Sequence, residues 1–183
     1  MSQDSHSFLD PGTAPVRISR RQVRRWWLAV FWVFITFAAL FLQVYLPAYL
    51  SLAAHVELPL LTTIYLAITV HDPVKGILYG ALVGIGQDAL AAHPLGLLGI
   101  VKTLAGYLAA TTALRLDVEN PAVRCVLVAL LFVFHQFFYW VLSEGLLGLK
   151  VDLAVEVTFA AAIANGVIGV LVFAGLDKLR EVI

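Results

Sequence analysis

Apolar residues fall into six long runs along the chain, separated by short polar segments or segments that contain Pro and Gly. A helix needs about 20 mostly apolar residues to cross the hydrocarbon core of a membrane. The pattern therefore predicts six transmembrane helices, at residues 26–50, 52–70, 74–92, 95–114, 122–142 and 154–176. The clearest loops are predicted at residues 72–75, 92–96, 115–121 and 143–152.

The second predicted helix is the least regular of the six. Glu57 and Pro59 interrupt its apolar run and leave a short uninterrupted stretch. Residues 51–57 are an alternative surface segment, in which case the helix is short or tilted. A full span keeps the later basic residues on the same side of the membrane as the N-terminal tail, and this favours six spans.

Composition places the chain in the class of all-α polytopic membrane proteins. It has 183 residues, of which 61% are hydrophobic and 13% charged, whereas soluble domains are about half apolar and about a quarter charged. We expect a basic, partly disordered cytoplasmic tail at residues 1–25, a six-helix transmembrane domain at 26–177 and a short cytoplasmic C-terminus at 178–183. The apolar run at 26–50 is longer than a signal-peptide core of about 7–15 residues.

The distribution of basic residues predicts the orientation. With six spans, Lys150 falls on one side and Lys102 within a span. The other side receives Arg17, Arg20, Arg21, Arg24, Arg25, Lys75, Arg115, Arg124, Lys178 and Arg180. Cytoplasmic loops carry the excess of Lys and Arg, so both termini are expected in the cytoplasm. The five arginines of the tail are expected to set topology or to bind anionic lipid.

Charge and motifs argue against several function classes. The formal net charge is zero and no basic stripe with interleaved aromatics lies outside the apolar runs, so we expect no nucleic-acid partner. Cys125, the single cysteine, forms no internal disulfide and matches no metal-ligand spacing. Catalytic signatures such as G-x-S-x-G and H-E-x-x-H are absent from the sequence. We expect no enzyme, no cofactor and no metal site.

A stripe of small residues runs along the third predicted helix. Gly76, Gly80 and Gly84 follow one another at four-residue intervals and lead to Asp88. Such spacing lets another helix approach closely. The stripe has two interpretations, packing within the bundle, which we favour, or docking of a partner's helix.

Asp88 and Lys102 stand at similar distances on either side of the turn at residues 93–95. In an antiparallel hairpin they lie at similar depth, about 10 Å below the turn. Ionisable groups within a membrane usually face the bundle interior and pair with one another. We expect an intramembrane Asp88–Lys102 pair; the alternative is that Asp88 forms a cap or lines a small cavity.

Residues 76–110, GILYGALVGIGQDALAAHPLGLLGIVKTLAGYLAA, resemble the rod shape-determining MreD family. Members carry a Gly-rich helix that ends in an acid, a short turn, P-L-G-L, and a second helix that ends in G-Y-L. Here the matching positions include Asp88, Pro94, Gly96, Gly106 and Tyr107. Many members have His or Asn where Leu98 stands, and an apolar residue where Lys102 stands.

The resemblance implies an integral membrane scaffold of the bacterial elongation (rod) complex. Such a scaffold supports cell-shape maintenance and lateral peptidoglycan synthesis by binding an MreC-like partner. Further implied partners are an MreB-like filament, a RodA-type glycosyltransferase and a class B penicillin-binding protein. The implied fold is a compact bundle resembling the S components of energy-coupling-factor transporters. The alternative function is a substrate-binding subunit of a vitamin-type transporter, with a ligand near Asp88, His93 and Lys102.

Overall fold

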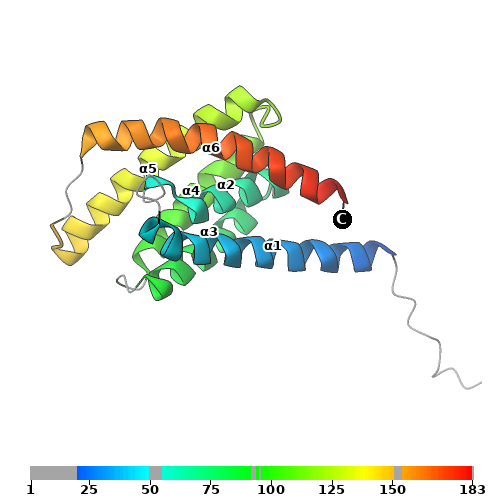
Figure 1. Ribbon diagram of the computed structural model, residues 1–183, viewed down its shortest axis with the longest axis horizontal. Helices are drawn as coiled ribbons and strands as arrows, with labels where there is room; N and C mark the ends of the chain where they lie inside the picture. Colours follow the sequence, from blue (N-terminus) through cyan, green and yellow to red (C-terminus); the bar gives the residue numbers. More distant parts are fainter. Residues whose placement is uncertain (1–19, 50–54, 92–93, 95, 151–153, 183) are drawn as a thin grey trace, which may run out of the picture.

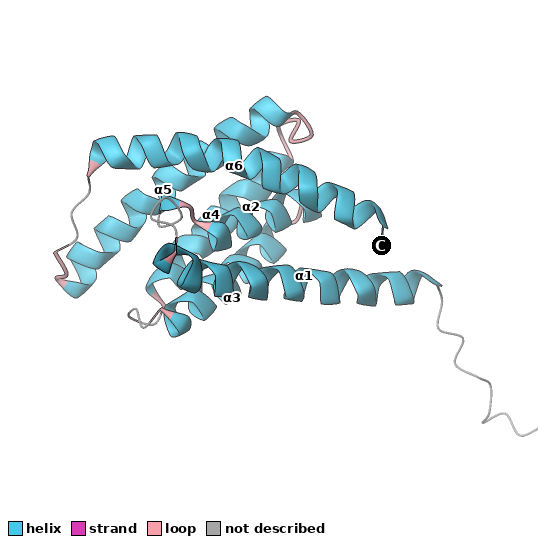
Figure 2. Cartoon of the chain, viewed as in Figure 1, coloured by secondary structure: helices cyan, strands magenta, loops and turns pink. Residues whose placement is uncertain are grey.

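The computed structural model describes residues 20–49, 55–91, 94, 96–150 and 154–182. Within these ranges the chain forms six α-helices, one short 3-10 helix and no strand (Figures 1 and 2). The elements are α1 (Arg20–Tyr45), η1 (Leu46–Ala48), α2 (Leu58–Val70), α3 (Pro73–Leu90), α4 (Leu97–Ala113), α5 (Pro121–Leu147) and α6 (Val155–Val182). The prediction of an all-helical chain is confirmed.

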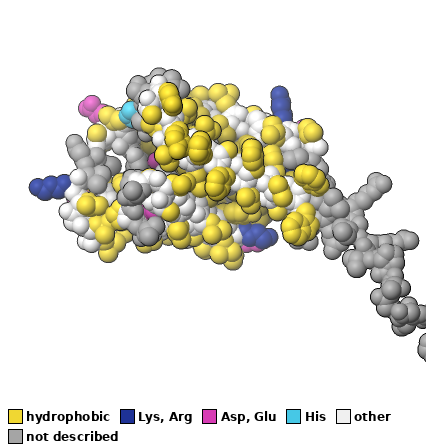
Figure 3. Space-filling view, turned by 60° about the horizontal axis from the view of Figure 1, so that its bottom comes forward, with side chains coloured by type: hydrophobic (Ala, Val, Ile, Leu, Met, Phe, Trp, Pro, Cys, Tyr) yellow, Lys and Arg dark blue, Asp and Glu magenta, His cyan; other side chains and the backbone are white. Residues whose placement is uncertain are grey.

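Three helical stretches are long and apolar enough to cross a membrane, at Trp26–Ala48, Pro121–Leu147 and Val155–Val182. α2 and α4 are shorter apolar helices. Side chains such as Phe34, Leu82 and Leu171 expose more than two thirds of their surface, and hydrophobic side chains dominate the face in Figure 3. Exposed apolar surface of this extent is typical of a protein that faces lipid rather than water.

Several helix boundaries differ from the predicted ones. α1 begins at Arg20, inside the expected tail, and α6 continues to Val182, through the expected cytoplasmic C-terminus. α5 continues through Ser143 and Glu144 and ends where Gly148 adopts a left-handed conformation with φ of 63°. Polar residues are compatible with exposed ends of helices, so the end of an apolar run underestimates helix length.

The expected loop at residues 72–75 is mostly helix. Asp72 accepts hydrogen bonds from the backbone N–H groups of Val74 and Lys75, and Pro73 occupies the first turn of α3. Both residue types favour helix starts at these positions. The Lys75 side chain hydrogen-bonds to the Asp72 carboxylate and lowers the pKa of that carboxyl.

α2 lies at the centre of the bundle. Every side chain from Leu60 to Ala67 exposes 4% or less of its surface. α1, α3 and α4 pack against it, with further contacts from α5 and α6 (Figure 1). A helix that is apolar all round is expected in such a position. The alternative prediction of a short second helix is confirmed, because α2 has 13 residues and begins at Leu58.

A group of polar side chains joins α2, α5 and α6 at the end of the bundle where α6 ends. Asp177 of α6 accepts hydrogen bonds of 2.6 Å from the Tyr65 hydroxyl of α2 and from Arg124 of α5. Arg124 and Asp177 form an ion pair that is partly exposed. The start of α1 and the end of α6 lie at the same end of the molecule in Figure 1.

Candidate functional site

The glycine stripe of α3 is filled by α4 of the same chain. Gly76, Gly80 and Gly84 are buried. A Cβ atom added to Gly80 would overlap the carbonyl of Lys102, and additions to Gly76 and Gly84 would overlap the α4 backbone at Gly106 and Leu98. The prediction of internal packing is confirmed. The partner-helix interpretation of Gly76, Gly80 and Gly84 is wrong, because the close approach of α3 and α4 leaves no surface for another helix there.

Asp88 caps the start of α4. Its carboxylate accepts hydrogen bonds of 2.9–3.3 Å from the backbone N–H groups of Gly96, Leu98 and Gly99. The first N–H groups of a helix have no intrahelical partner and carry the positive end of the helix dipole. These groups satisfy the buried Asp88 charge without a basic side chain. The capping alternative of the sequence analysis is therefore confirmed.

Lys102 pairs with Glu57, and the expected Asp88–Lys102 pair is wrong. Among the described residues no ion pair joins Asp88 to Lys102; the Lys102 Nζ atom instead lies 3.4 Å from Glu57 Oε2. The Lys102 side chain is fully buried. The physical reason is that the N–H groups at the start of α4 bind the Asp88 carboxylate. Glu57, the residue before α2, supplies the carboxylate for Lys102.

Two further polar side chains complete the cluster around this pair. His135 Nε2 of α5 lies 3.1 Å from Lys102 Nζ, and Gln87 Nε2 of α3 donates to Glu57 Oε2 over 3.5 Å. An ammonium at Lys102 can only donate, so His135 Nε2 is the acceptor in that case, and among the described residues no partner reaches the buried His135 Nδ1. Four different segments therefore bring their polar side chains to one point inside the bundle.

The start of α2 is held by side chains from the two outer helices. Asn165 of α6 accepts from the Glu57 N–H over 3.0 Å, and Gln43 of α1 accepts from the Leu58 N–H over 2.9 Å. The Asn165 amide also donates to the His55 carbonyl over 2.7 Å. Buried backbone groups need such partners, so these contacts fix the position of Glu57 at the helix start.

A polar pocket of about 160 Å³ opens beside Glu57. It lies between the start of α2 and the facing parts of α5 and α6, and its lining residues are His55, Glu57, Phe132, Gln136, Ala154, Val157, Thr158 and Ala161. Lys102 and His135 lie behind Glu57 and do not line it. Sequence analysis did not identify this pocket; the signal available was a carboxylate inside an otherwise apolar segment.

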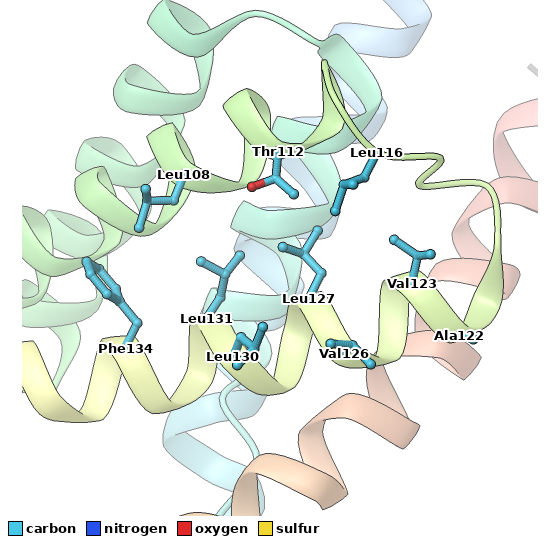
Figure 4. Close-up of a pocket in the computed structure, with 10 residues that line it drawn as sticks. All are labelled: Leu108, Thr112, Leu116, Ala122, Val123, Val126, Leu127, Leu130, Leu131 and Phe134. Carbon is cyan, nitrogen blue, oxygen red and sulfur yellow. The ribbon is translucent and has the colours of Figure 1, made fainter.

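A second, apolar groove separates α4 from α5. Its volume is about 560 Å³. Side chains from α4, from the connection after it and from α5 point into this space in Figure 4. Thr112 is the one polar side chain among its described lining residues, which are Leu108, Thr112, Leu116, Ala122, Val123, Val126, Leu127, Leu130, Leu131 and Phe134. The groove therefore suits an apolar occupant.

The remaining residues singled out from the sequence have separate places. Gly96 takes a left-handed conformation with φ of 98° at the start of α4, where glycine is favoured. Gly106 packs on Gly76, whereas Pro94 and Tyr107 are exposed. Arg20, Arg21, Arg24 and Arg25 belong to the first turns of α1. Arg17 and His93 lie outside the described residues.

Of three comparisons with known proteins, one identifies a family and two find no match. No match was found among curated proteins or among solved structures. A family model described as rod shape-determining protein MreD matches residues 20–180, which include all six helices except the last residues of α6. The glycine-packed hairpin and its Asp88 cap lie within the matched range. The chain belongs to the MreD family of rod shape-determining proteins.

Proposed function

We propose that this protein is an integral membrane scaffold of the bacterial elongation (rod) complex. Membership of the MreD family over residues 20–180 carries the proposal, because this family acts in rod-shape determination and is generally non-catalytic. The protein has no enzymatic activity of its own in this proposal. It supports lateral peptidoglycan synthesis by binding an MreC-like protein, and through it an MreB-like filament, a RodA-type glycosyltransferase and a class B penicillin-binding protein.

All six helices cross the inner membrane in this proposal. α2 has 13 residues and is about 20 Å long, too short for a hydrocarbon core of about 30 Å. Non-helical backbone within the membrane is tolerated where protein surrounds it. The hydrogen bonds from Glu57 and Leu58 to Asn165 and Gln43 support such an interior start for α2. The likeness to the S components of energy-coupling-factor transporters stays a prediction.

The termini are cytoplasmic in this proposal. The excess of basic residues on the side of both termini supports this orientation. The arginines at residues 17–25 then lie near anionic lipid headgroups, where each contributes about 1 kcal/mol of attraction. The polar pocket beside Glu57 accordingly opens on the outer side.

The apolar groove between α4 and α5 is the docking surface for the single span of the MreC-like partner in this proposal. Its lining is aliphatic and aromatic apart from Thr112, so a polar occupant is disfavoured. Val126 and Leu130 line it and are more than half exposed, so a partner's side chains reach them. A partner helix in the groove makes close packing contacts, whereas fluid lipid chains fill the same groove less regularly.

Co-purification from mild detergent tests both the partner and the surface. The tagged wild-type protein is expected to recover the MreC-like protein. Val126→Trp fills the groove and is expected to lower recovery about tenfold, the effect of losing about 1.4 kcal/mol of binding free energy. Ile163→Trp, on the exposed face of α6, is the matched control and is expected to leave recovery unchanged.

The outcomes separate the two parts of the proposal. Failure of the wild-type protein to recover any elongation-complex component contradicts the scaffold function. Full recovery with Val126→Trp contradicts the groove as the docking surface and leaves the scaffold function standing.

A small-molecule transport subunit is the second candidate function, and the polar pocket beside Glu57 favours it. Recovery of ATPase subunits in place of an MreC-like protein would support this candidate. A gene for an energising ATPase beside this one would support it in the same way.

A further inference from the structure

Glu57 lines the polar pocket, and its two carboxylate oxygens differ in their partners within the protein. The hydrogen bonds from Lys102 and Gln87 both end on Oε2, and among the described residues none reaches Oε1. The Glu57 side chain retains 20% of its exposure, while Lys102 behind it has none. A carboxylate accepts about four hydrogen bonds, so Oε1 is available to an occupant of the pocket.

The acceptor is held in place before any occupant arrives. The Glu57 backbone N–H is bound by Asn165, and the carboxylate is bound from behind by two buried side chains. A group fixed in this way loses little conformational entropy when it binds a ligand. Gln136 and Thr158 also line the pocket, and their side chains carry an amide oxygen and a hydroxyl oxygen that can accept hydrogen bonds.

The charge around the pocket favours a cation. Glu57 is the one carboxylate among the described residues that line the pocket, this lining contains no Lys or Arg, and its other titratable side chain is His55. A pocket lined by one sign of charge concentrates ions of the opposite sign.

We infer that the pocket between the start of α2, α5 and α6 binds a primary ammonium group, with Glu57 Oε1 as its charged acceptor. A primary ammonium is a compact charge with three donors, and the pocket offers three acceptor groups in Glu57, Gln136 and Thr158. The volume of about 160 Å³ is well above the roughly 10–15 Å³ that one water molecule needs, so the pocket admits a small polar group. The ammonium belongs to a small free amine or to the headgroup of an amine-bearing lipid. The inference is independent of the scaffold proposal.

Thiol labelling inside the pocket tests the charge preference. Val157→Cys in a Cys125→Ala background places a single thiol on the pocket wall without removing an acceptor. The purified protein in phosphatidylcholine–phosphatidylglycerol nanodiscs is treated with a cationic or an anionic methanethiosulfonate. Rates are normalised to those of a free thiol. We expect the cationic reagent to react about tenfold faster.

Matched variants assign the preference to Glu57. Glu57→Gln combined with Lys102→Met removes both members of the ion pair and leaves the net charge unchanged, and it is expected to bring the rate ratio close to one. Glu144→Gln removes an exposed carboxylate at the same end and is expected to retain the ratio. Gln136→Leu leaves the ion pair intact and replaces the double variant if the latter does not fold. It is expected to weaken the protection of the Val157→Cys thiol that added ethanolamine gives in the experiment below.

Two arms identify the source of the ammonium. Ethanolamine is expected to slow labelling by a neutral thiol reagent. Choline has no N–H donor and is expected to leave the labelling rate unchanged. This pair of results assigns the ammonium to a free amine. Slower labelling without added amine when phosphatidylethanolamine replaces phosphatidylcholine assigns the lipid headgroup. A rate ratio near one in the parent, an unchanged ratio in the double variant, or no protection in either arm would overturn the inference.

Discussion

At the scale of single residues, the structure satisfies its buried charges by two different means. Asp88 receives backbone N–H groups from the start of α4, and Lys102 receives a carboxylate from the residue before α2. Burial of a charge is costly unless it is paired and hydrogen-bonded. Removal of one partner is therefore more damaging than removal of both.

A double-variant experiment tests this at Glu57 and Lys102. Glu57→Gln leaves the fully buried Lys102 unpaired and is expected to cost about 3–5 kcal/mol of stability. Lys102→Met is expected to cost less, because Glu57 is 20% exposed and borders the pocket. The double variant is expected to be more stable than Glu57→Gln alone. Thermal unfolding in detergent ranks the stabilities of the three variants.

Glu144→Gln combined with Lys150→Met is the control, since both side chains are exposed and no ion pair joins them among the described residues. Strictly additive losses at Glu57 and Lys102 would contradict a direct interaction between the two side chains.

At the scale of helices, the close contact of α3 with α4 depends on the absence of side chains. Gly76 meets Gly106, Gly80 meets the backbone at Lys102, and Gly84 meets the backbone at Leu98 and Gly99. Small residues at helix crossings permit this approach within a membrane. The hairpin also places Lys102 opposite Glu57 and Gln87, so its spacing determines the polar cluster.

Gly80→Ala tests this contact. The added methyl group overlaps the carbonyl of Lys102, and backbone cannot rotate away as a side chain can. We expect a loss of about 1–3 kcal/mol or more, the usual cost of overpacking. Gly175→Ala on α6 is the matched control, because a Cβ atom there meets nothing within 4 Å. It is expected to gain up to about 1 kcal/mol from the higher helix propensity of Ala.

Thermal midpoints of the two glycine variants in the same detergent give the comparison. Equal stability of Gly80→Ala and the wild-type protein would contradict the α3–α4 packing.

At the scale of the whole molecule, the two ends of the bundle differ in charge and chemistry. The end with the start of α1 and the end of α6 holds the Tyr65–Asp177–Arg124 contacts and basic residues such as Arg180. The opposite end holds the start of α2, the polar pocket and an excess of acidic residues. The positive-inside rule orients such a molecule with the basic end in the cytoplasm.

Cysteine accessibility in spheroplasts tests this orientation. Arg115→Cys and Lys150→Cys, each in a Cys125→Ala background, place exposed thiols at opposite ends. A membrane-impermeant thiol reagent is expected to label Lys150→Cys in intact spheroplasts. It is expected to label Arg115→Cys only after permeabilisation. The reverse pattern would place the termini outside. Labelling of both variants in intact spheroplasts would contradict the proposed single crossing by α5 between residues 115 and 150.

The sequence by itself determined the helical class, the approximate location of all six helices and the family. Hydropathy is a local property, so runs of apolar residues are readable without a structure. The capping signal Asp72-Pro73 is local too, but the prediction of a loop at residues 72–75 overlooked it. The glycine spacing likewise predicted a close helix contact, because four-residue intervals place small residues on one side of a helix.

Tertiary structure alone decided which charge pairs with which. Asp88 and Lys102 are symmetric about a turn, yet Lys102 pairs with Glu57, 45 residues earlier in the chain. His135 and Asn165 join the same region from α5 and α6. Such contacts depend on the relative rotation and depth of helices, which local patterns do not specify. The polar pocket and the α4–α5 groove are also products of helix packing, so the sequence did not reveal them.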